Sequence, residues 1–310
     1  MATTHNITTS FSGKAAEGYL RAALLSGKTL NSGAVDIRDN VQHKEVVQLL
    51  SSDANLVKPA TCDFDPTGTL TTTEVVLEPT EFQVNLEVCA KNYRSSWESL
   101  QMRGIRSGIP NSLGEFILEH VVAKTNDAIE KAIWTNSTSS TDLPFDGWET
   151  LAAANSDVVD VSASSVTASN VTDEIGKVVD AIPSAVLAQE DLYIYLPTAI
   201  FYKYVRALGG FASQGQGASG IGNEGHLWYK GQQELFYDGI KVLHSPGMTS
   251  TKMMAATRHN MLVGTSLFSE LNQASILDMS SLDGSQNARC ILRGSIGVEL
   301  GYGSEVVLYS

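Results

Sequence analysis

The clearest pattern of hydrophobic and polar positions is a strict alternation over residues 81–89, EFQVNLEVC. Phe82, Val84, Leu86 and Val88 fall on one face of an extended chain, and polar or charged residues occupy the intervening positions. This alternation predicts a β-strand with one buried face.

An apolar stripe at helical spacing runs through residues 113–134, LGEFILEHVVAKTNDAIEKAIW. The residues of the stripe are Leu113, Phe116, Ile117, Val121, Ala128, Ala132 and Ile133. At about 1.5 Å per residue, such a helix would be roughly 33 Å long. The pattern predicts that this is the longest helix of the chain.

One segment of the first quarter of the chain predicts a β-hairpin with few large apolar side chains. Its flanks, residues 55–64 and 69–77, favour β-strand, and the second flank is rich in Thr and Val. Between them are four residues in the order that a type I turn favours: Asp65, Pro66, Thr67 and Gly68. Because an isolated hairpin is only marginally stable in water, we expect this one to project and to pack on a neighbour.

The remaining patterns alternate between helix and strand. Residues 14–26, 171–182 and 197–208 predict helices, and residues 191–196, DLYIYL, predict a buried strand. From residue 234 the chain consists mostly of short β-prone segments, and residues 289–309 predict a final hairpin. The sum is an α+β fold with a helical middle and a β-rich second half.

The segment GQGASG, residues 215–220, has the G-x-G-x-x-G spacing of a dinucleotide-binding loop. Such a loop must follow a strand and open a helix, so that backbone N–H groups face the phosphates. Here the preceding residues 197–208 predict a helix, and no helical stripe follows. Seven glycines among residues 209–225 instead predict a long loop, and no cofactor is expected.

Composition excludes several classes of function. The chain has 21 Lys and Arg against 34 Asp and Glu, a net charge of −13, without the basic clusters that bind duplex DNA tightly. Three scattered cysteines and six histidines lack the spacing of a disulfide framework or a metal site. No nucleophile elbow is present. With neither a secretory signal nor a long apolar run, we expect an intracellular protein that does not span a membrane.

The order of these parts resembles the major capsid proteins of tailed bacteriophages, which share the fold named after phage Hong Kong 97. Local segments are also similar to that family. They are the helix GEFILEHVVAKTNDAIEKAIW, the strand and helix DLYIYLPTAIFYKYVRAL, the segments GIKVLHSPGM and ATRHNMLVGTSL, and the terminal strands RCILRGSIGVELGYGSEVVLY.

The resemblance implies a division of the chain into four parts. These are an N-terminal arm (1–50), an extended-loop hairpin (51–80), a peripheral domain (81–165) with spine helix 113–134 and returning strands near 286–302, and an axial domain (166–285) with a C-terminal strand (303–310). It implies that Lys58, Asp65, Pro66, Thr67 and Gly68 of the hairpin contact neighbouring subunits. The axial loop would contain Gly215, Gly217, Gly220, Gly222 and Trp228.

The resemblance also implies a function. The chain would be a structural protein, not an enzyme, that assembles into hexamers and pentamers of an icosahedral shell around double-stranded DNA, without sequence-specific DNA binding. It would be made in the host cytoplasm and reside in the virion. Because no long charged helical segment precedes the arm, a separate scaffold protein is implied, together with a portal and cement proteins.

Three alternatives stay open at this point. An encapsulin, a nanocompartment shell of the same fold, is the first. A β-rich decoration or adhesin protein is the second, although it leaves the long helix unexplained. A hydrolase whose site is assembled in space is the third.

Overall fold

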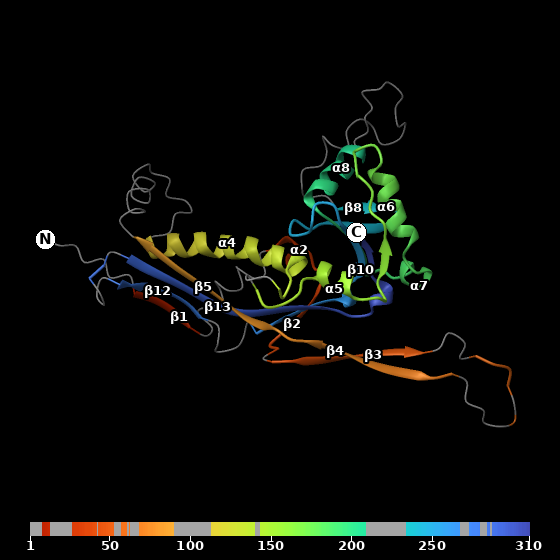
Figure 1. Ribbon diagram of the computed structural model, residues 1–310, viewed down its shortest axis with the longest axis horizontal. Helices are drawn as coiled ribbons and strands as arrows, with labels where there is room; N and C mark the ends of the chain where they lie inside the picture. The colour runs from red at the N-terminus through yellow and green to blue at the C-terminus, as the bar shows by residue number, and fades with distance from the viewer. Residues whose placement is uncertain are drawn as a thin grey trace, which may run out of the picture.

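In the part of the chain that the structure describes, the body contains two six-stranded sheets, and a separate two-stranded ribbon projects from it (Figure 1). The computed structural model describes residues 8–12, 27–41, 43–52, 57–60, 62, 68–89, 113–139, 143–208, 234–266, 273–279, 284–285 and 287–310. The predicted helix over residues 14–26 lies outside these ranges.

The first sheet is organised by one long strand, β13 (Asn287–Leu300). Its strands follow the order β1 (Thr8–Ser12), β12 (Gln273–Asp278), β13, β11 (Met261–Thr265) and β2 (Asp36–Asp39), and β5 (Thr80–Cys89) also pairs with β13. The β2–β11 pair is parallel and the other pairs are antiparallel.

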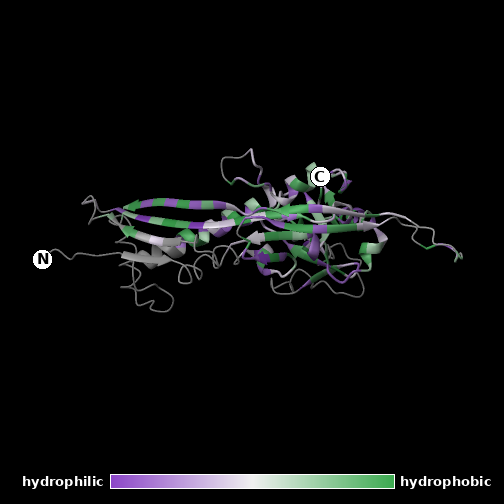
Figure 2. Ribbon diagram, turned by 90° about the horizontal axis from the view of Figure 1, so that it is seen from below, coloured by the Kyte–Doolittle hydropathy of each residue, from purple (hydrophilic) through white to green (hydrophobic). Residues whose placement is uncertain are grey.

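The predicted strand over 81–89 is confirmed as β5, and its alternation is visible as stripes along the long strands of Figure 2. Phe82 and Val88 are buried and Val84 is half-buried, as the pattern predicts. Leu86, however, is 42% exposed. Over this stretch β5 pairs only with β13 among the described strands, so Leu86 lies on a sheet edge that is incompletely covered.

The predicted long helix is confirmed as α4 (Leu113–Thr135) and lies along the first sheet (Figure 1). Val121, Ala132 and Ile133 are buried as predicted. Ala128 is exposed, and Ile129 occupies the buried position instead. Ile129 falls on the same face as Val122 and Ile133 at spacings of seven and four residues, which places the larger side chain in the core.

The second sheet has the strand order β6 (Val159–Val161), β14 (Val307–Tyr309), β10 (Met253–Thr257), β7 (Leu192–Leu196), β9 (Ile240–His244) and β8 (Leu235–Tyr237). Helices α6 (Val171–Asp180), α7 (Ser184–Leu187) and α8 (Thr198–Leu208) accompany it. The sequence predicts α6, β7 and α8 within a few residues of these bounds. Their apolar faces form a core of their own around Ile175, Ile194 and Phe201.

The predicted final hairpin over 289–309 is wrong. Its first strand, β13, belongs to the first sheet, and its second, β14, belongs to the second sheet. The chain crosses between the sheets through Gly301, Tyr302 and the 3₁₀ turn η4 (Gly303–Glu305). β-Prone residues on both sides of a glycine-containing turn suggest a hairpin, but each strand finds its partners elsewhere in the chain.

The two sheets share a core at their junction. Trp134 at the end of α4, Trp148 on α5 (Trp148–Ala154) and Tyr195 on β7 are fully buried. The Trp134 ring lies 5.0 Å from that of Trp148 and 5.3 Å from that of Tyr195, centroid to centroid. Large aromatic side chains in contact hold the helical layer to the second sheet. Two short elements, α2 (Lys28–Asn31) and η2 (Arg258–Asn260), complete the junction.

The projecting ribbon is formed by β3 (Glu45–Ser52) and β4 (Leu70–Leu77). The second predicted hairpin strand is therefore confirmed as β4, but the first, over 55–64, is wrong. Residues 57–60 have no strand structure, and β3 begins ten residues earlier than the predicted strand. The eight residues of β3, EVVQLLSS, pair one to one with β4, from Glu45↔Leu77 to Ser52↔Leu70, and the β-branched and aliphatic residues among them favour strand.

Candidate functional site

The most unusual surface of the molecule is one face of the β3–β4 ribbon. Val46, Leu50, Leu70 and Val76 are 50%, 55%, 67% and 41% exposed. The register sets Val46 opposite Val76, Leu50 opposite Thr72 and Ser52 opposite Leu70, so all these side chains point to the same side. We refer to Val46, Leu50, Leu70 and Val76 as the apolar ribbon face. Such a row of exposed aliphatic side chains is typical of an interaction surface.

The opposite face of the ribbon is less exposed near the body. Glu45, Val47 and Leu49 are half-buried, and Leu77 is fully buried at the base. Beyond the base the ribbon leaves the body without a covering layer (Figure 1). Two strands alone are marginally stable in water. We therefore expect another molecule to cover the ribbon.

The predicted contact residues of the hairpin lie on the connection between β3 and β4. Lys58 is half-buried, and its neighbour Val57 is 94% exposed. Gly68 has a φ of +93°, in the left-handed region that favours glycine, just before β4 begins. Asp65, Pro66 and Thr67 lie outside the described residues, so the predicted type I turn stays a prediction.

The predicted axial-loop residues lie outside the part of the chain that the structure describes. They are Gly215, Gly217, Gly220, Gly222 and Trp228. The element before them is the helix α8, as predicted, and the first described strand after them is β8. At the end of α8 and on β8, Leu208 and Phe236 are 41% and 53% exposed.

A buried polar cluster ties the segment around α2 to α4. Trp134 Nε1 donates to Thr29 Oγ1 at 3.0 Å, and the Thr29 hydroxyl and backbone N–H both donate to the carboxylate of Glu130. Glu130 is 5% exposed, and this burial raises its pKa above the usual value, against the lowering effect of the Thr29 hydrogen bonds. A buried carboxylate that accepts two donors fixes the place of this short segment on α4.

A second polar cluster ties α2 to the second sheet. Lys28 Nζ lies 2.8 Å from His244 Nδ1, and His244 Nε2 lies 2.9 Å from Thr198 Oγ1. The imidazole stacks on Phe201 with ring centroids 4.9 Å apart. Burial, and then the nearby Lys28 charge, lower the pKa of His244 to about 4. The neutral ring accepts from Lys28 through Nδ1 and donates to Thr198 through Nε2.

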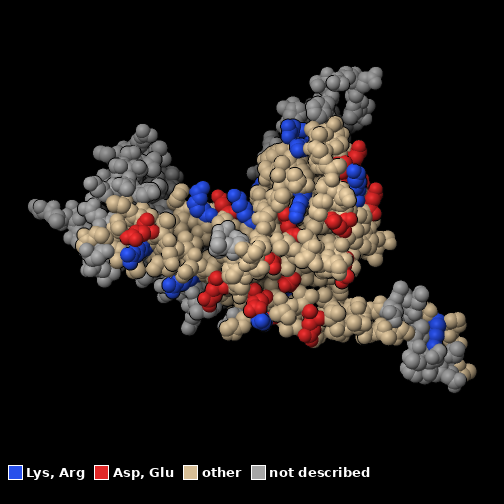
Figure 3. All heavy atoms as spheres, in the orientation of Figure 1, with Lys and Arg blue, Asp and Glu red and all other residues tan. Residues whose placement is uncertain are grey.

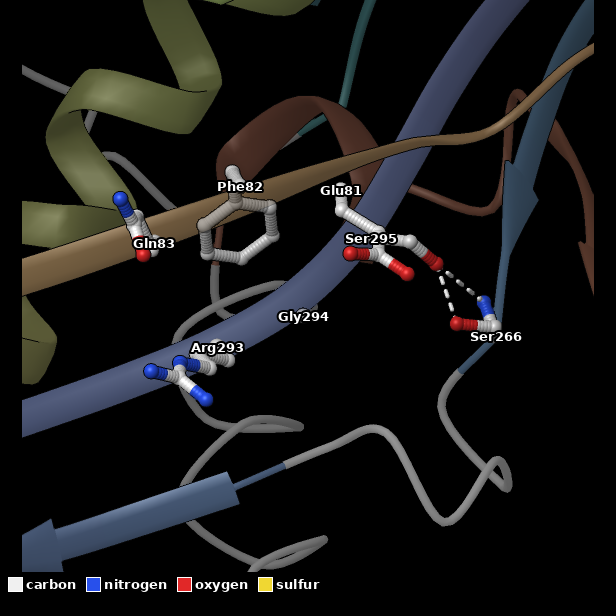
Figure 4. Close-up of a pocket in the computed structure, with 7 residues that line it drawn as sticks. All are labelled: Glu81, Phe82, Gln83, Ser266, Arg293, Gly294 and Ser295. Atoms are coloured by element: carbon white, nitrogen blue, oxygen red, sulfur yellow. Dashed lines mark hydrogen bonds between the residues drawn. The ribbon is translucent and has the colours of Figure 1, made fainter.

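A small pocket lies between β5, β13 and the end of β11 (Figure 4). It is lined by Glu81, Phe82, Gln83, Ser266, Arg293, Gly294 and Ser295. The hydroxyls of Ser266 and Ser295 bond to each other, and the Ser266 backbone N–H donates to Ser295 Oγ at 3.2 Å. The lining residues include one carboxylate, that of Glu81, and one guanidinium, that of Arg293, but no histidine.

Polar side chains elsewhere in the described residues also connect elements of the fold. No group of three or more His, Cys, Asp or Glu side chains among them is arranged to hold a metal ion. Glu149 on α5 accepts from the Thr249 N–H and hydroxyl, each at 2.7 Å, and so ties α5 to the loop after β9. On the face shown in Figure 3, Lys and Arg side chains are scattered, and acidic ones gather along the edge where the ribbon leaves the body.

Sequence reasoning missed the residues that hold the ribbon and the junction together. Tyr302 bonds to the backbone of β3, and Asn260, Glu130 and His244 connect distant segments. For Asn260 a signal existed, because the segment ATRHNMLVGTSL contains it at the start of an Asn-x-x-x-Gly pattern. For the others, no spacing in the sequence marks the partner.

Comparisons with known proteins give matches among solved structures only. No family model matches the chain, and no curated protein does. A structure from Mycobacterium phage Cain matches at 12% identity with a TM-score of 0.58, covering 92% of this chain and 90% of that one. A chain from the capsid of a native GTA particle matches at 12% identity with a TM-score of 0.56, covering 100% and 94%. A virus-like particle from Pyrococcus furiosus matches at 7% identity with a TM-score of 0.53, covering 96% and 99%.

At these identities the similarity is one of fold, and it extends over nearly the whole chain. The α+β fold that the patterns predict, and the Hong Kong 97 type that the resemblance implies, are thereby confirmed.

Proposed function

We propose, from the premise that this chain has the fold found in phage and particle shells, that it is a structural major capsid protein of a tailed phage. Copies of the chain would assemble into hexamers and pentamers of an icosahedral shell that encloses double-stranded DNA. The observation that carries this proposal is the apolar ribbon face, a row of exposed aliphatic side chains on a ribbon that extends from the body.

The physical support begins with the cost of leaving this face in water. Val46, Leu50, Leu70 and Val76 are each 41–67% exposed, and covering apolar surface contributes about 25 cal/mol per Å². A second copy of the chain is the occupant that a closed symmetric assembly supplies to every ribbon at once. We infer that Lys58, Asp65, Pro66, Thr67 and Gly68 contact the same neighbouring subunit.

Charge supports enclosure of DNA without tight binding. The net charge of −13 gives no excess of cations to neutralise phosphates, and Lys and Arg are scattered on the face of Figure 3. A shell that must package and release DNA benefits from this weak contact. We therefore place the protein in the virion, and in the host cytoplasm during assembly. None of the helices that the structure describes is long and apolar enough to cross a bilayer.

The proposed role is structural and not enzymatic. The polar clusters of the described residues tie elements together, and the hydroxyls of the serine pair in the pocket of Figure 4 bond to each other. The division into arm (1–50), extended loop (51–80), peripheral domain (81–165) and axial domain (166–285) belongs to this proposal. So do an axial contact formed by Gly215, Gly217, Gly220, Gly222 and Trp228, and partnership with separate scaffold, portal and cement proteins.

A second candidate is the shell of an encapsulin-type nanocompartment. It is favoured by the similarity to the virus-like particle from Pyrococcus furiosus, which covers 96% of this chain and 99% of that one. The two candidates share the subunit contact of the ribbon and differ in cargo. Nucleic acid inside particles made in the native producer supports the phage shell, and a packaged enzyme supports the nanocompartment.

The test is assembly of the purified chain, observed by negative-stain electron microscopy and light scattering. We expect closed shells, or pentamers and hexamers, for the wild type and for Leu50→Met, which keeps the ribbon face apolar. Leu50→Lys should remain folded by circular dichroism and stay unassembled, because a charge would be buried at the contact. A wild type that stays monomeric with and without lysate of its producer contradicts the proposed function.

A further inference from the structure

The ribbon is anchored to the body at its base. Leu77, the last residue of β4, is fully buried, and its side chain reaches over Gly264 on β11. A Cβ on Gly264 would lie 3.0 Å from Leu77 Cδ2, so the absence of a side chain makes room for this plug. Gly297 on β13 lies directly opposite Gly264 in the sheet, and a Cβ there would lie only 2.6 Å from the backbone carbonyl oxygen of Glu78.

A second anchor holds the ribbon farther out, on the other strand. The backbone N–H of Leu50 donates to Tyr302 Oη at 2.8 Å, and Tyr302 Oη donates to the Leu50 carbonyl at 3.1 Å. One phenol therefore occupies both backbone groups that Leu50 presents at the open edge of β3. Leu50 is five residues along β3 from Glu45, which pairs with Leu77 at the base. The two anchors are thus separated by about 17 Å of strand.

The residue that carries the second anchor is itself held in place. Asn260 is 2% exposed, and its Oδ1 accepts the Tyr302 N–H at 3.0 Å. Its carbonyl accepts the Gly301 N–H at 3.0 Å, and its Nδ2 donates to Glu305 Oε2 at 2.8 Å. Three hydrogen bonds from one buried side chain and its backbone fix the crossover on which Tyr302 stands.

We infer that Tyr302 is a positioning residue that sets the direction in which the ribbon projects, with Asn260 holding Tyr302 in the orientation this requires. A ribbon attached only at its base can swing about that point, whereas two anchors on different strands define a direction. The inference rests on the proposed function for its consequence, since the direction of the ribbon decides which surface of a neighbouring copy it meets. Both residues of the Asn-x-x-x-Gly pattern act in these anchors. Asn260 holds Tyr302, and Gly264 makes room for Leu77.

The test compares Tyr302→Phe with the matched control Tyr193→Phe, which removes the same hydroxyl from a partly buried tyrosine on β7. Amide hydrogen exchange of the unassembled full chain is measured first. We expect exchange within residues 45–52 to become about five-fold faster in Tyr302→Phe only, with the core strands and the melting temperature close to wild type. Unchanged exchange in this segment, or an equal rise throughout the protein, would overturn the inference.

Assembly gives the second readout. Tyr302→Phe should yield malformed particles or a broader size distribution by electron microscopy, whereas Tyr193→Phe should match the wild type. Uniform wild-type particles from Tyr302→Phe would overturn the positioning role. If the wild type itself fails to assemble, the proposed function fails, and the exchange measurement still decides whether Tyr302 holds the ribbon.

Discussion

The hydroxyl of Tyr309, the penultimate residue, donates a hydrogen bond of 2.7 Å to Glu174 Oε2 inside the second sheet's core. The same hydroxyl accepts the backbone N–H of Ser164 at 2.8 Å. Lys177, one helical turn further along α6, donates to both oxygens of Glu174 at 2.8 and 2.9 Å. Hydrogen bonds to the Glu174 carboxylate from Lys177 first, and then from the side chains of Ser164 and Tyr309, lower its pKa to about 2. The end of the chain is thus bound to a helix 135 residues earlier.

Removing this hydroxyl should destabilise the protein. In Tyr309→Phe, the Ser164 N–H and the Glu174 carboxylate each lose a partner in a buried place, at a cost of about 1–3 kcal/mol. Urea unfolding of the unassembled protein measures the loss. The control Tyr202→Phe removes a hydroxyl from a side chain that is 48% exposed and should change stability by less than about 0.5 kcal/mol. Equal effects of the two changes would contradict the role given to Tyr309.

The lowered pKa of His244 predicts that the protein loses stability in mild acid. Its pKa is lowered to about 4, so between pH 6.5 and 4 the unfolded chain binds a proton that the folded protein does not. The contribution of neutral His244 to the free energy of unfolding is therefore fully present above pH 6.5 and is lost as the pH falls toward 4. Because the ring is partly exposed, we expect the free energy of unfolding to fall by only about 1–2 kcal/mol over this range.

The measurement is the free energy of unfolding at several pH values between 7 and 4, for the wild type and for His244→Gln. The variant lacks the titrating ring, so the difference between the two proteins should shrink as pH falls through this window. Glu174, whose own contribution to stability is lost between about pH 4.5 and 2, is present in both proteins and so cancels in the difference. A difference that stays constant with pH would show that His244 is not held neutral by the fold.

Short-range patterns were enough to predict those elements that have a clear apolar periodicity of their own. The alternation in β5 and the stripe of α4 predict both elements to within one residue. They were less reliable for single side chains, since Leu86 lies on a sheet edge and Ala128 faces solvent. Periodicity states which residues share a face and does not state how far a neighbouring layer extends over that face.

Strand pairing and the ties between segments could not be predicted in the same way. The residues 289–309 contain two strands and a glycine turn, but β13 and β14 belong to different sheets because distant strands compete for them. Tyr302 and Leu50 are 252 residues apart, and Lys28 and His244 are 216 apart. The sequence around such residues does not distinguish them from other residues of the same type. Local patterns gave the order of the elements along the chain, and only the resemblance to a family implied how that order forms one fold.

The aromatic cluster at the junction of the two sheets should be the most sensitive part of the core. Trp134 is fully buried, contacts the rings of Trp148 and Tyr195, and donates to Thr29. Trp134→Ala should cost about 3–5 kcal/mol through the cavity it leaves, and Trp134→Phe distinctly less, because most of the volume is retained. Urea unfolding of both variants checks this order. A loss below about 1 kcal/mol for Trp134→Ala would mean that the site collapses without penalty.

The two facing glycines at the base of the ribbon should differ in their tolerance of a methyl group. A Cβ on Gly297 would lie 2.6 Å from the carbonyl oxygen of Glu78 and 2.9 Å from Pro79 Cα, and backbone atoms cannot rotate away. A Cβ on Gly264 would meet side-chain atoms of Leu77 and Pro79 at 3.0 Å, which can adjust by small rotations. We expect Gly297→Ala to cost about 1–3 kcal/mol and Gly264→Ala clearly less. Urea unfolding gives the costs, and hydrogen exchange at residues 77–80 locates the change at the base of the ribbon. If Gly264→Ala proves the more damaging, the ribbon is held chiefly by the Leu77 plug and not by the close approach of the Glu78 backbone to β13.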